Sequence, residues 1–281
     1  MTYKALPTKI TLENHSYRFA HYPNPGAEPA ILLIGNLQEI ESVDQFSKAA
    51  QKELDVYCVE LPGCGLNPPL HASYRIQDHS YLLKTLIDWL GISALHLMVF
   101  SYSTPIALEF CRAYGNQVRS LALGGSMSSI TPEQRRHTLS LVGDVLADRS
   151  KFAESFIDTL TSSQCAGRKS EIIRRAAKRK CQRYTEDQIW CFIENTLRIC
   201  SYSFEKPEQI NIPHSVCFTG GLDPYVTPER CFELARKIGA DFALIDACDH
   251  LFHLREPEQT IQLMLSAYHS YSRSITTKKI A

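Results

Sequence analysis

The sequence predicts an α/β fold, with a mostly parallel central sheet and helices on both of its faces. Short continuous apolar runs, such as Leu95 to Phe100, are typical of strands that are buried on both faces. Segments whose apolar residues have helical spacing alternate with these runs, as they do in βαβ units. With 281 residues, one large domain or a domain with an insertion can bury a sizeable core.

The N-terminal part of the chain begins with a predicted hairpin and continues as alternating strands and helices. Residues 9–13 and 17–21 alternate apolar and polar side chains on either side of Asn14-His15, which predicts two antiparallel strands. The elements expected next are strand 30–34, helix 43–54, strand 56–61, helix 78–90, strand 95–100, helix 106–114 and strand 118–123.

This alternation stops near Thr131. From Pro132 to about Tyr202 the apolar spacing is helical, which predicts a helical insertion that acts as a lid. The predicted domains are therefore a core of residues 1–130 and 205–281 and a cap of residues 131–204. The core resumes with strand 214–219, helix 228–238, strand 242–246 and helix 257–271, and the polar tail from Ser272 is expected to fray.

Charge and cysteine usage exclude several functional classes. Lys+Arg and Asp+Glu are equal at 30 each, so no global field attracts nucleic acid or an anionic membrane. The start, Met1 to Lys4, lacks the apolar segment of a secretory signal, and no apolar run is long enough to span a bilayer, so we expect a cytoplasmic protein. Ten cysteines are scattered without metal-ligand spacing, as in a reducing compartment, and we expect neither a metal nor a cofactor.

Ser103 is the candidate nucleophile. It lies between a predicted buried strand and a predicted helix, where a tight turn exposes the hydroxyl of a nucleophile elbow and the helix N-terminus favours developing negative charge. The usual elbow has glycine two residues before and after the serine, and here those positions hold Ser101 and Pro105. An ordinary strand–helix turn is the alternative interpretation of this segment.

Other loops at the same predicted sheet edge carry suggestive residues. Ligands bind beyond the carboxyl ends of the strands in such sheets. Residues 35–37 follow strand 30–34, residues 220–224 follow strand 214–219, and Asp249-His250 follows strand 242–246. Serine, acid and histidine therefore occur in the chain order of an α/β-hydrolase triad.

From residue 8 to about residue 270, the chain resembles the α/β-hydrolase fold superfamily. The segments that carry the resemblance are residues 32–36, 59–65, 101–105, 219–223 and 249–252. The resemblance implies a serine hydrolase or acyltransferase in which Ser103 attacks an acyl carbonyl, His250 takes its proton and Asp223 orients the imidazole. The backbone N–H groups of Leu37 and Thr104 would form the oxyanion hole.

Each of these roles has a simpler alternative. His250 could be an ordinary loop histidine, and its nearest rival as the base is His253, for which we expect a packing role in the following helix. Asp223 could be a turn residue before a proline, with other acids as fallbacks, namely Asp144, Asp246 and Asp249. The competing functional class is a non-catalytic α/β-hydrolase fold that binds a ligand or partner, because a fold alone does not fix function.

Residues 223–227 and the Ser-x-Ser elbow also resemble the acyltransferases that make 3-(3-hydroxyalkanoyloxy)alkanoates for rhamnolipid synthesis. The predicted helical insertion is similar in length. This narrower resemblance implies a fatty-acyl ester or thioester substrate, so that an esterase, a thioesterase and a 3-hydroxyacyl acyltransferase all remain open.

A basic stretch in the predicted cap is a candidate docking surface. Arg174, Arg175, Lys178 and Arg179 lie beside an apolar stripe on the same predicted helix. An acyl carrier protein or a coenzyme A thioester would fit, because both are anionic. The alternative is a solvated basic face over a packed stripe. We expect no nucleic-acid partner, because no nucleic-acid-binding motif is recognised.

Overall fold

The computed structural model describes residues 6–203 and 210–280, and these form one eight-stranded sheet in the order β1-β2-β4-β3-β5-β6-β7-β8. β1 (Thr8–Leu12) and β2 (His15–Tyr22) form the predicted antiparallel hairpin, and β2 also pairs antiparallel with β4. The remaining pairings are parallel. The parallel strands are β3 (Pro29–Leu33), β4 (Asp55–Glu60), β5 (Leu95–Phe100), β6 (Val118–Gly124), β7 (Ser215–Gly220) and β8 (Asp241–Ile245).

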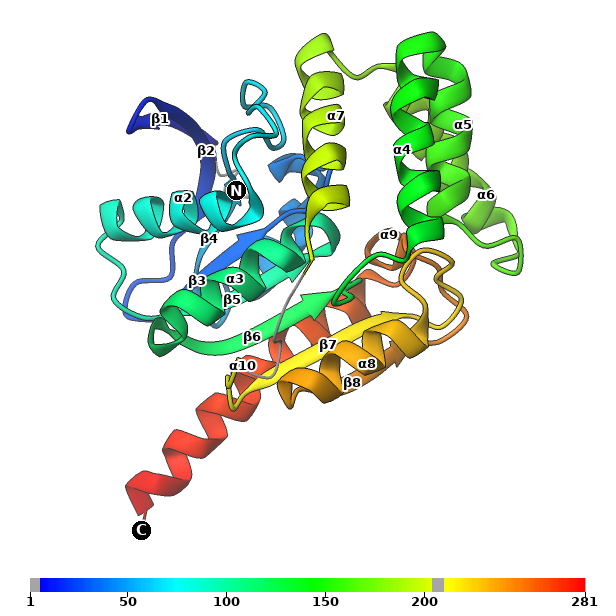
Figure 1. Cartoon of the computed structure of the whole chain (residues 1–281). Coiled ribbons are helices and arrows are strands. Elements are labelled where there is room, and N and C mark those ends of the chain that lie inside the picture. The colour runs from blue at the N-terminus through cyan, green and yellow to red at the C-terminus, as the bar shows by residue number, and fades with distance from the viewer. Residues whose placement is uncertain (1–5, 204–209, 281) are drawn as a thin grey trace.

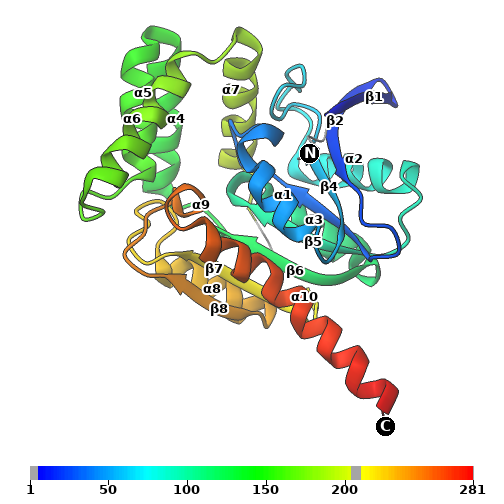
Figure 2. The ribbon, with the colours of Figure 1, turned by 180° about the vertical axis from the view of Figure 1, so that it is seen from behind.

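Helices cover both faces of the sheet, as the sequence predicts (Figures 1 and 2). Side chains alternate between the faces along each strand. Ile31 and Leu33 pack on one side, and Ala30 and Leu32 on the other. The first side carries α2 (Ile76–Trp89), α3 (Thr104–Tyr114) and α8 (Pro228–Ile238), and the second carries α1 (Asp44–Ala50) and α10 (Pro257–Ile280).

Between β6 and β7, the described residues form four helices, which we call the cap helices. They stand together at one end of the sheet (Figure 1). Thr131 and Thr185 accept hydrogen bonds from the N–H groups of Gln134 and Gln188, which fixes where α4 and α7 begin. The cap helices are α4 (Pro132–Ala147), α5 (Arg149–Leu160), α6 (Arg168–Gln182) and α7 (Glu186–Ser201).

The helical spacing predicted for this stretch is therefore matched by helices. The division into a core domain and a lid, and the mobility of that lid, remain predictions. The predicted boundary between residues 204 and 205 lies outside the described residues.

The prediction of a frayed tail from Ser272 is wrong, because α10 continues to Ile280. Side-chain contacts support this extension. His214 packs edge-on against Tyr271 and lies within hydrogen-bond distance of the hydroxyls of Ser270 and Ser274. The end of α10 extends beyond the body of the protein (Figures 1 and 2). Within the described ranges, no helix has the length and hydropathy needed to cross a membrane.

Candidate active site

Three side chains from three strand ends form a hydrogen-bonded series. The Oγ of Ser101 lies 2.9 Å from Nε2 of His250, and Nδ1 of His250 lies 2.7 Å from Oδ2 of Asp223. The serine follows β5, the aspartate follows β7 and the histidine follows β8. The series therefore lies beyond the carboxyl ends of the parallel strands, where ligands bind in sheets of this kind.

Ser101 occupies a strained turn. It is the first residue after β5 and begins a 3₁₀ turn, η2 (Ser101–Ser103), which leads directly into α3. Its φ angle is +46°, in the left-handed region that side chains other than glycine rarely adopt. Such a strand-to-helix turn exposes the serine hydroxyl. Gly35 makes room for the side chain of Ser101, since a Cβ at residue 35 would lie 3.3 Å from the Cβ of Ser101.

The structure places the predicted nucleophile Ser103 elsewhere. Its hydroxyl is buried and donates to the backbone carbonyl of Ile34, so it does not contact His250. Ser103 instead occupies the position two residues after Ser101, where an elbow needs a small side chain. Pro105 lies in the first turn of α3, where its missing N–H costs nothing, and is not a departure from the elbow.

Sequence reasoning missed Ser101 although a signal for it was present. The predicted strand ends at Phe100, so Ser101 is the first residue after that strand. The elbow places its nucleophile at the sharp turn itself. Centring the motif on the more C-terminal serine shifted the whole pattern by two residues.

Asp223 is held by four hydrogen bonds. Its Oδ1 accepts from the backbone N–H groups of Tyr225 and Val226, at 2.9 and 2.8 Å. Its Oδ2 accepts from the Thr219 hydroxyl at 2.8 Å as well as from His250. A carboxylate can only accept, so His250 carries its proton on Nδ1 and presents Nε2 as an acceptor to the Ser101 hydroxyl.

Opposing effects act on the pKa of His250. Burial lowers this pKa, but the charge of Asp223 and its hydrogen bond outweigh burial, and the pKa is raised above its ordinary value of 6.5. His253, the rival base, faces Gln38, with 3.1 Å between their Nε2 atoms. Burial lowers the pKa of His253 to about 3, so its imidazole is neutral and fits the predicted packing role.

The fallback acids are engaged elsewhere or exposed. Asp249 is fully buried and forms a two-point ion pair with Arg255, with both N–O distances at 2.7 Å. Asp144 pairs with Lys151 at 2.7 Å, and Asp246 is exposed. Asp223 is therefore the carboxylate that the structure brings to His250.

One of the two predicted oxyanion-hole donors is wrong. The N–H of Thr104 donates to the carbonyl of Ser101 within η2, so it is not available to a ligand. Tyr102, which directly follows Ser101, lies at the start of η2, where N–H groups have no partner within the helix. Leu37 and Tyr102 both line the adjoining cavity.

The cavity has a volume of about 460 Å³ and lies between the strand ends and the cap helices. This is the size of a small-molecule site. Ser101 and His250 line it from the core, and Lys180 and Tyr184 are polar residues that line it from the cap. Apolar side chains from the cap make up much of the remaining wall, among them Leu141, Phe156, Ile173, Ala177, Phe192 and Ile199.

Three of the four predicted docking cations on α6 have acidic partners within the cap. Arg174 binds Asp158 of α5 at 2.5 Å, and Lys178 binds Glu154 of the same helix. Arg175 pairs with Glu171 of its own helix at 3.0 Å, and Arg179 is exposed. Three of the four cations thus already have acidic neighbours. Among the described residues, no group of three His, Cys, Asp or Glu side chains could hold a metal ion.

Comparisons with known sequences agree with this architecture. A family model described as alpha/beta hydrolase fold matches residues 29–166. Among curated proteins, the poly(3-hydroxyalkanoate) depolymerase of Ectopseudomonas oleovorans is 25% identical over 118 residues, which are 42% of this chain. The match likewise covers 42% of that relative's length.

The solved structures match a larger share of this chain than the curated sequence does. MGS-M2, an alpha/beta hydrolase enzyme from a Medee basin deep-sea metagenome library, gives a TM-score of 0.85 at 16% identity over 93% of this chain and 97% of that one. A thermophilic esterase from Thermogutta terrifontis gives 0.79 at 18% identity, over 95% and 99%. The enol-lactonase from Burkholderia xenovorans gives 0.81 at 14% identity, over 93% and 100%. Identities this low show a shared fold.

Proposed function

Because this chain has the α/β-hydrolase fold, we propose that it is a serine-dependent acyl-transfer enzyme that hydrolyses acyl esters. The observation that carries the proposal is the series of Ser101, His250 and Asp223 beside an apolar cavity. A non-catalytic binding protein of this fold has no need for a strained serine aimed at a histidine that is itself held by a buried acid.

The proposed reaction has two halves. In the first, the Ser101 oxygen attacks the acyl carbonyl while Nε2 of His250 takes its proton, and the leaving alcohol then receives that proton as the ester bond breaks. In the second, His250 takes a proton from water, whose oxygen attacks the acyl-serine. The proton returns to the serine oxygen as the carboxylic acid leaves. Asp223 stays ionised throughout and stabilises the imidazolium.

Two backbone N–H groups would stabilise the oxyanion. We assign them to Tyr102, which follows the nucleophile, and to Leu37, in the loop after β3. Each such donor typically contributes about 3 kcal/mol of transition-state stabilisation. Tyr102 replaces Thr104 in this role because the N–H of Thr104 is already used.

The cavity wall supports an apolar acyl group as the substrate. Phe156 and Phe192 lie in edge-to-face contact and form part of an apolar wall supplied by the cap. A fatty-acyl ester would bury its chain against this wall. The name of the curated relative refers to a 3-hydroxyalkanoate polyester, which supports a 3-hydroxyacyl ester as the specific substrate class.

A simple ester is favoured over a thioester delivered by an acidic carrier. Docking of an acyl carrier protein or coenzyme A would require unpaired cations on α6. Arg174 and Lys178 instead hold α6 to α5, and Arg175 has its own glutamate. Arg179 is the member of the predicted patch for which the structure gives no acidic partner within 4 Å among the described residues.

Hydrolysis of p-nitrophenyl esters of increasing acyl length tests the proposal. We expect turnover that rises with chain length until the cavity is filled, and we expect none from Ser101→Ala. Binding of the longer esters without turnover by the native protein would instead establish the non-catalytic alternative.

A further inference from the structure

The loop of residues 35–39 follows β3, and we call it the oxyanion loop. Its central residue, Leu37, has a φ angle of +58°. For a residue with a side chain this left-handed conformation costs about 1–2 kcal/mol, so the surrounding structure must hold it in place.

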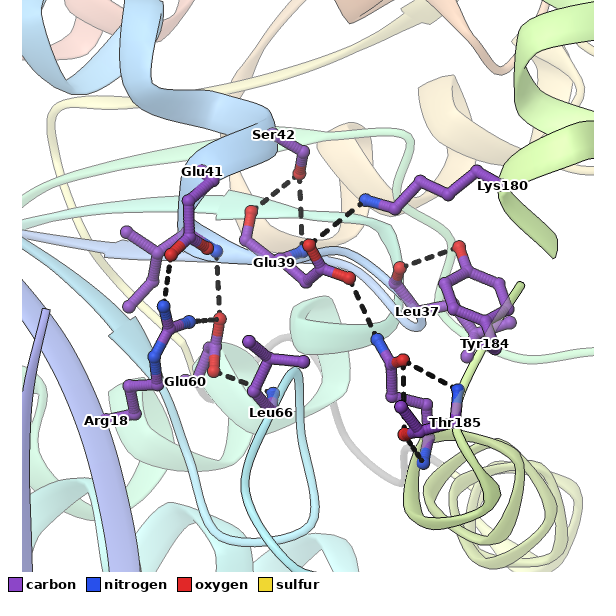
Figure 3. A network of polar contacts seen from close by, with 12 residues as sticks. Arg18, Leu37, Glu39, Glu41, Ser42, Glu60, Leu66, Lys180, Tyr184 and Thr185 are labelled. Atoms are coloured by element: carbon purple, nitrogen blue, oxygen red, sulfur yellow. Dashed lines mark hydrogen bonds and ion pairs between the residues drawn. The ribbon is translucent and has the colours of Figure 1, made fainter.

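The cap helices hold Leu37 at two points. Its side chain is 7% exposed and packs in the apolar cluster of the cap, together with Leu141 and Phe192, rather than in the core of the sheet. Its carbonyl oxygen accepts a hydrogen bond from the Tyr184 hydroxyl at 3.0 Å (Figure 3). Tyr184 lies in the short link between α6 and α7. Burial raises the pKa of Tyr184 well above its usual range, so the hydroxyl stays protonated and donates.

The cap also holds the neighbours of Leu37. The Nε2 of Gln188 on α7 donates to Oε1 of Glu39 at 2.8 Å, and Nζ of Lys180 on α6 lies 3.5 Å from Oε2 of the same carboxylate (Figure 3). About two turns further along α7, Nδ2 of Asn195 donates to Oδ1 of Asn36 at 3.2 Å. These contacts involve side chains of the loop, whereas Tyr184 fixes a main-chain atom of Leu37 itself.

The core holds the backbone just after the loop. The backbone N–H of Ile40, just after the loop, donates to Oε1 of the buried Glu60 at 2.9 Å, and Arg18 binds that same oxygen at 2.6 Å (Figure 3). Within the loop itself, the N–H of Gly35 donates to the side chain of Gln38 at 2.6 Å. The segment just after the loop is thus tied to the core, while Asn36, Leu37 and Glu39 are tied to the cap.

We propose that Tyr184 is a positioning residue for acyl transfer: its hydroxyl holds the Leu37 carbonyl, and this contact helps to keep the backbone of Leu37 in the conformation in which its N–H faces the cavity where the oxyanion forms. The cap therefore takes part in the chemical step and does not only select substrates. This inference rests on the proposed function, since an oxyanion arises only in acyl transfer.

The test compares two tyrosines from which one hydroxyl is removed. Tyr184→Phe deletes the bond to Leu37. Tyr17→Phe is the matched control, because Tyr17 is also buried and its hydroxyl also donates to a backbone carbonyl, that of Leu82 at 3.1 Å, away from the cavity. The loss of either hydrogen bond should lower the free energy of unfolding by about 1 kcal/mol, so both variants should fold.

We expect Tyr184→Phe to lower kcat about ten-fold with KM within about two-fold of wild type, because the lost interaction acts on the transition state. Tyr17→Phe should leave both constants unchanged. The rate of serine labelling by a fluorophosphonate should fall in parallel with kcat, since phosphonylation needs the same donors.

The outcomes separate the two proposals. A native protein that neither turns over esters nor reacts with the fluorophosphonate would overturn the proposed function itself. A native protein that reacts, together with a Tyr184→Phe variant that reacts as fast as Tyr17→Phe, would overturn the positioning role alone. A fall in kcat shared equally by both variants would have the same meaning, because it would reflect general stability.

Discussion

Ser101 and His250 are separated by 149 positions in the sequence, yet Oγ of the first lies 2.9 Å from Nε2 of the second. The contact depends on the turn after β5, which gives Ser101 its positive φ, and on the loop after β8, which carries His250. The hydroxyl of Ser103, two residues further on, donates instead to the backbone carbonyl of Ile34. Under the proposed function, this relationship makes Ser101 and not Ser103 the serine that transfers the acyl group.

Replacement of the two serines should have opposite effects. Ser101→Ala should abolish ester hydrolysis, because no other hydroxyl contacts His250 in the described part of the chain, and it should leave the fold intact. Ser103→Ala should keep activity within about five-fold of wild type while lowering the free energy of unfolding by about 1 kcal/mol, the usual effect of losing one buried hydrogen bond. Turnover of a p-nitrophenyl ester and urea denaturation measure the two effects.

The pH dependence of kcat/KM should follow His250. The base must be neutral, and its pKa is raised because Asp223 outweighs the effect of burial, so activity should fall on the acid side with a midpoint above 6.5. In Asp223→Asn the burial effect remains without the opposing charge, so the midpoint should move to lower pH. The maximal rate should drop by a factor on the order of 10³–10⁴. An unchanged midpoint in this variant would mean that Asp223 does not act on the base.

The ion pair of Asp249 and Arg255 should be a major source of stability. Both side chains are buried, so Asp249→Ala would leave an unpaired buried guanidinium. We expect a loss of about 3–5 kcal/mol in the free energy of unfolding, measured by urea denaturation. The control is Glu171→Ala, which breaks an exposed pair with Arg175 and should change stability by no more than about 1 kcal/mol. Similar losses for both variants would contradict this ranking.

The wall supplied by α6 should limit acyl chain length. Ala177 lines the cavity from the cap, and a phenylalanine there would fill space that a long acyl chain needs. Ala177→Phe should therefore lower kcat/KM for long-chain p-nitrophenyl esters much more than for the acetate ester. The ratio of the two constants is the measurement, and an equal loss on both esters would place the acyl group elsewhere in the cavity.

Much of the fold could be predicted because its signals are local. Buried strands such as β5 are continuous apolar runs, and the cap helices show helical spacing in a stretch without strand patterns. The helical end of α10 could not be predicted in this way, because Ser274 contacts His214, which is distant in the sequence. This contact supports the helix as far as Ser274, and the remaining turns to Ile280 extend beyond the body of the protein (Figure 1).

The site was predictable as far as it depends on chain order. Asp223 and His250 lie in the loops after predicted strands, and the structure joins them. Ser103 was predicted in place of Ser101 because motif matching counts residues, whereas the contact with His250 depends on the backbone angle of Ser101, which the residue type does not reveal. Thr104 was misplaced with it. The bond between Tyr184 and Leu37 spans 147 positions and depends on how the cap packs, so no local pattern indicates it.

The central claim is that Ser101 is the nucleophile, and covalent labelling tests it most directly. The native protein would be treated with a fluorophosphonate, digested, and sequenced by fragmentation mass spectrometry, which distinguishes two serines in one peptide. We predict a single phosphonyl group on Ser101, absent from Ser101→Ala and still present in Ser103→Ala. A label on Ser103, or no label on either serine in an active native protein, would contradict this account.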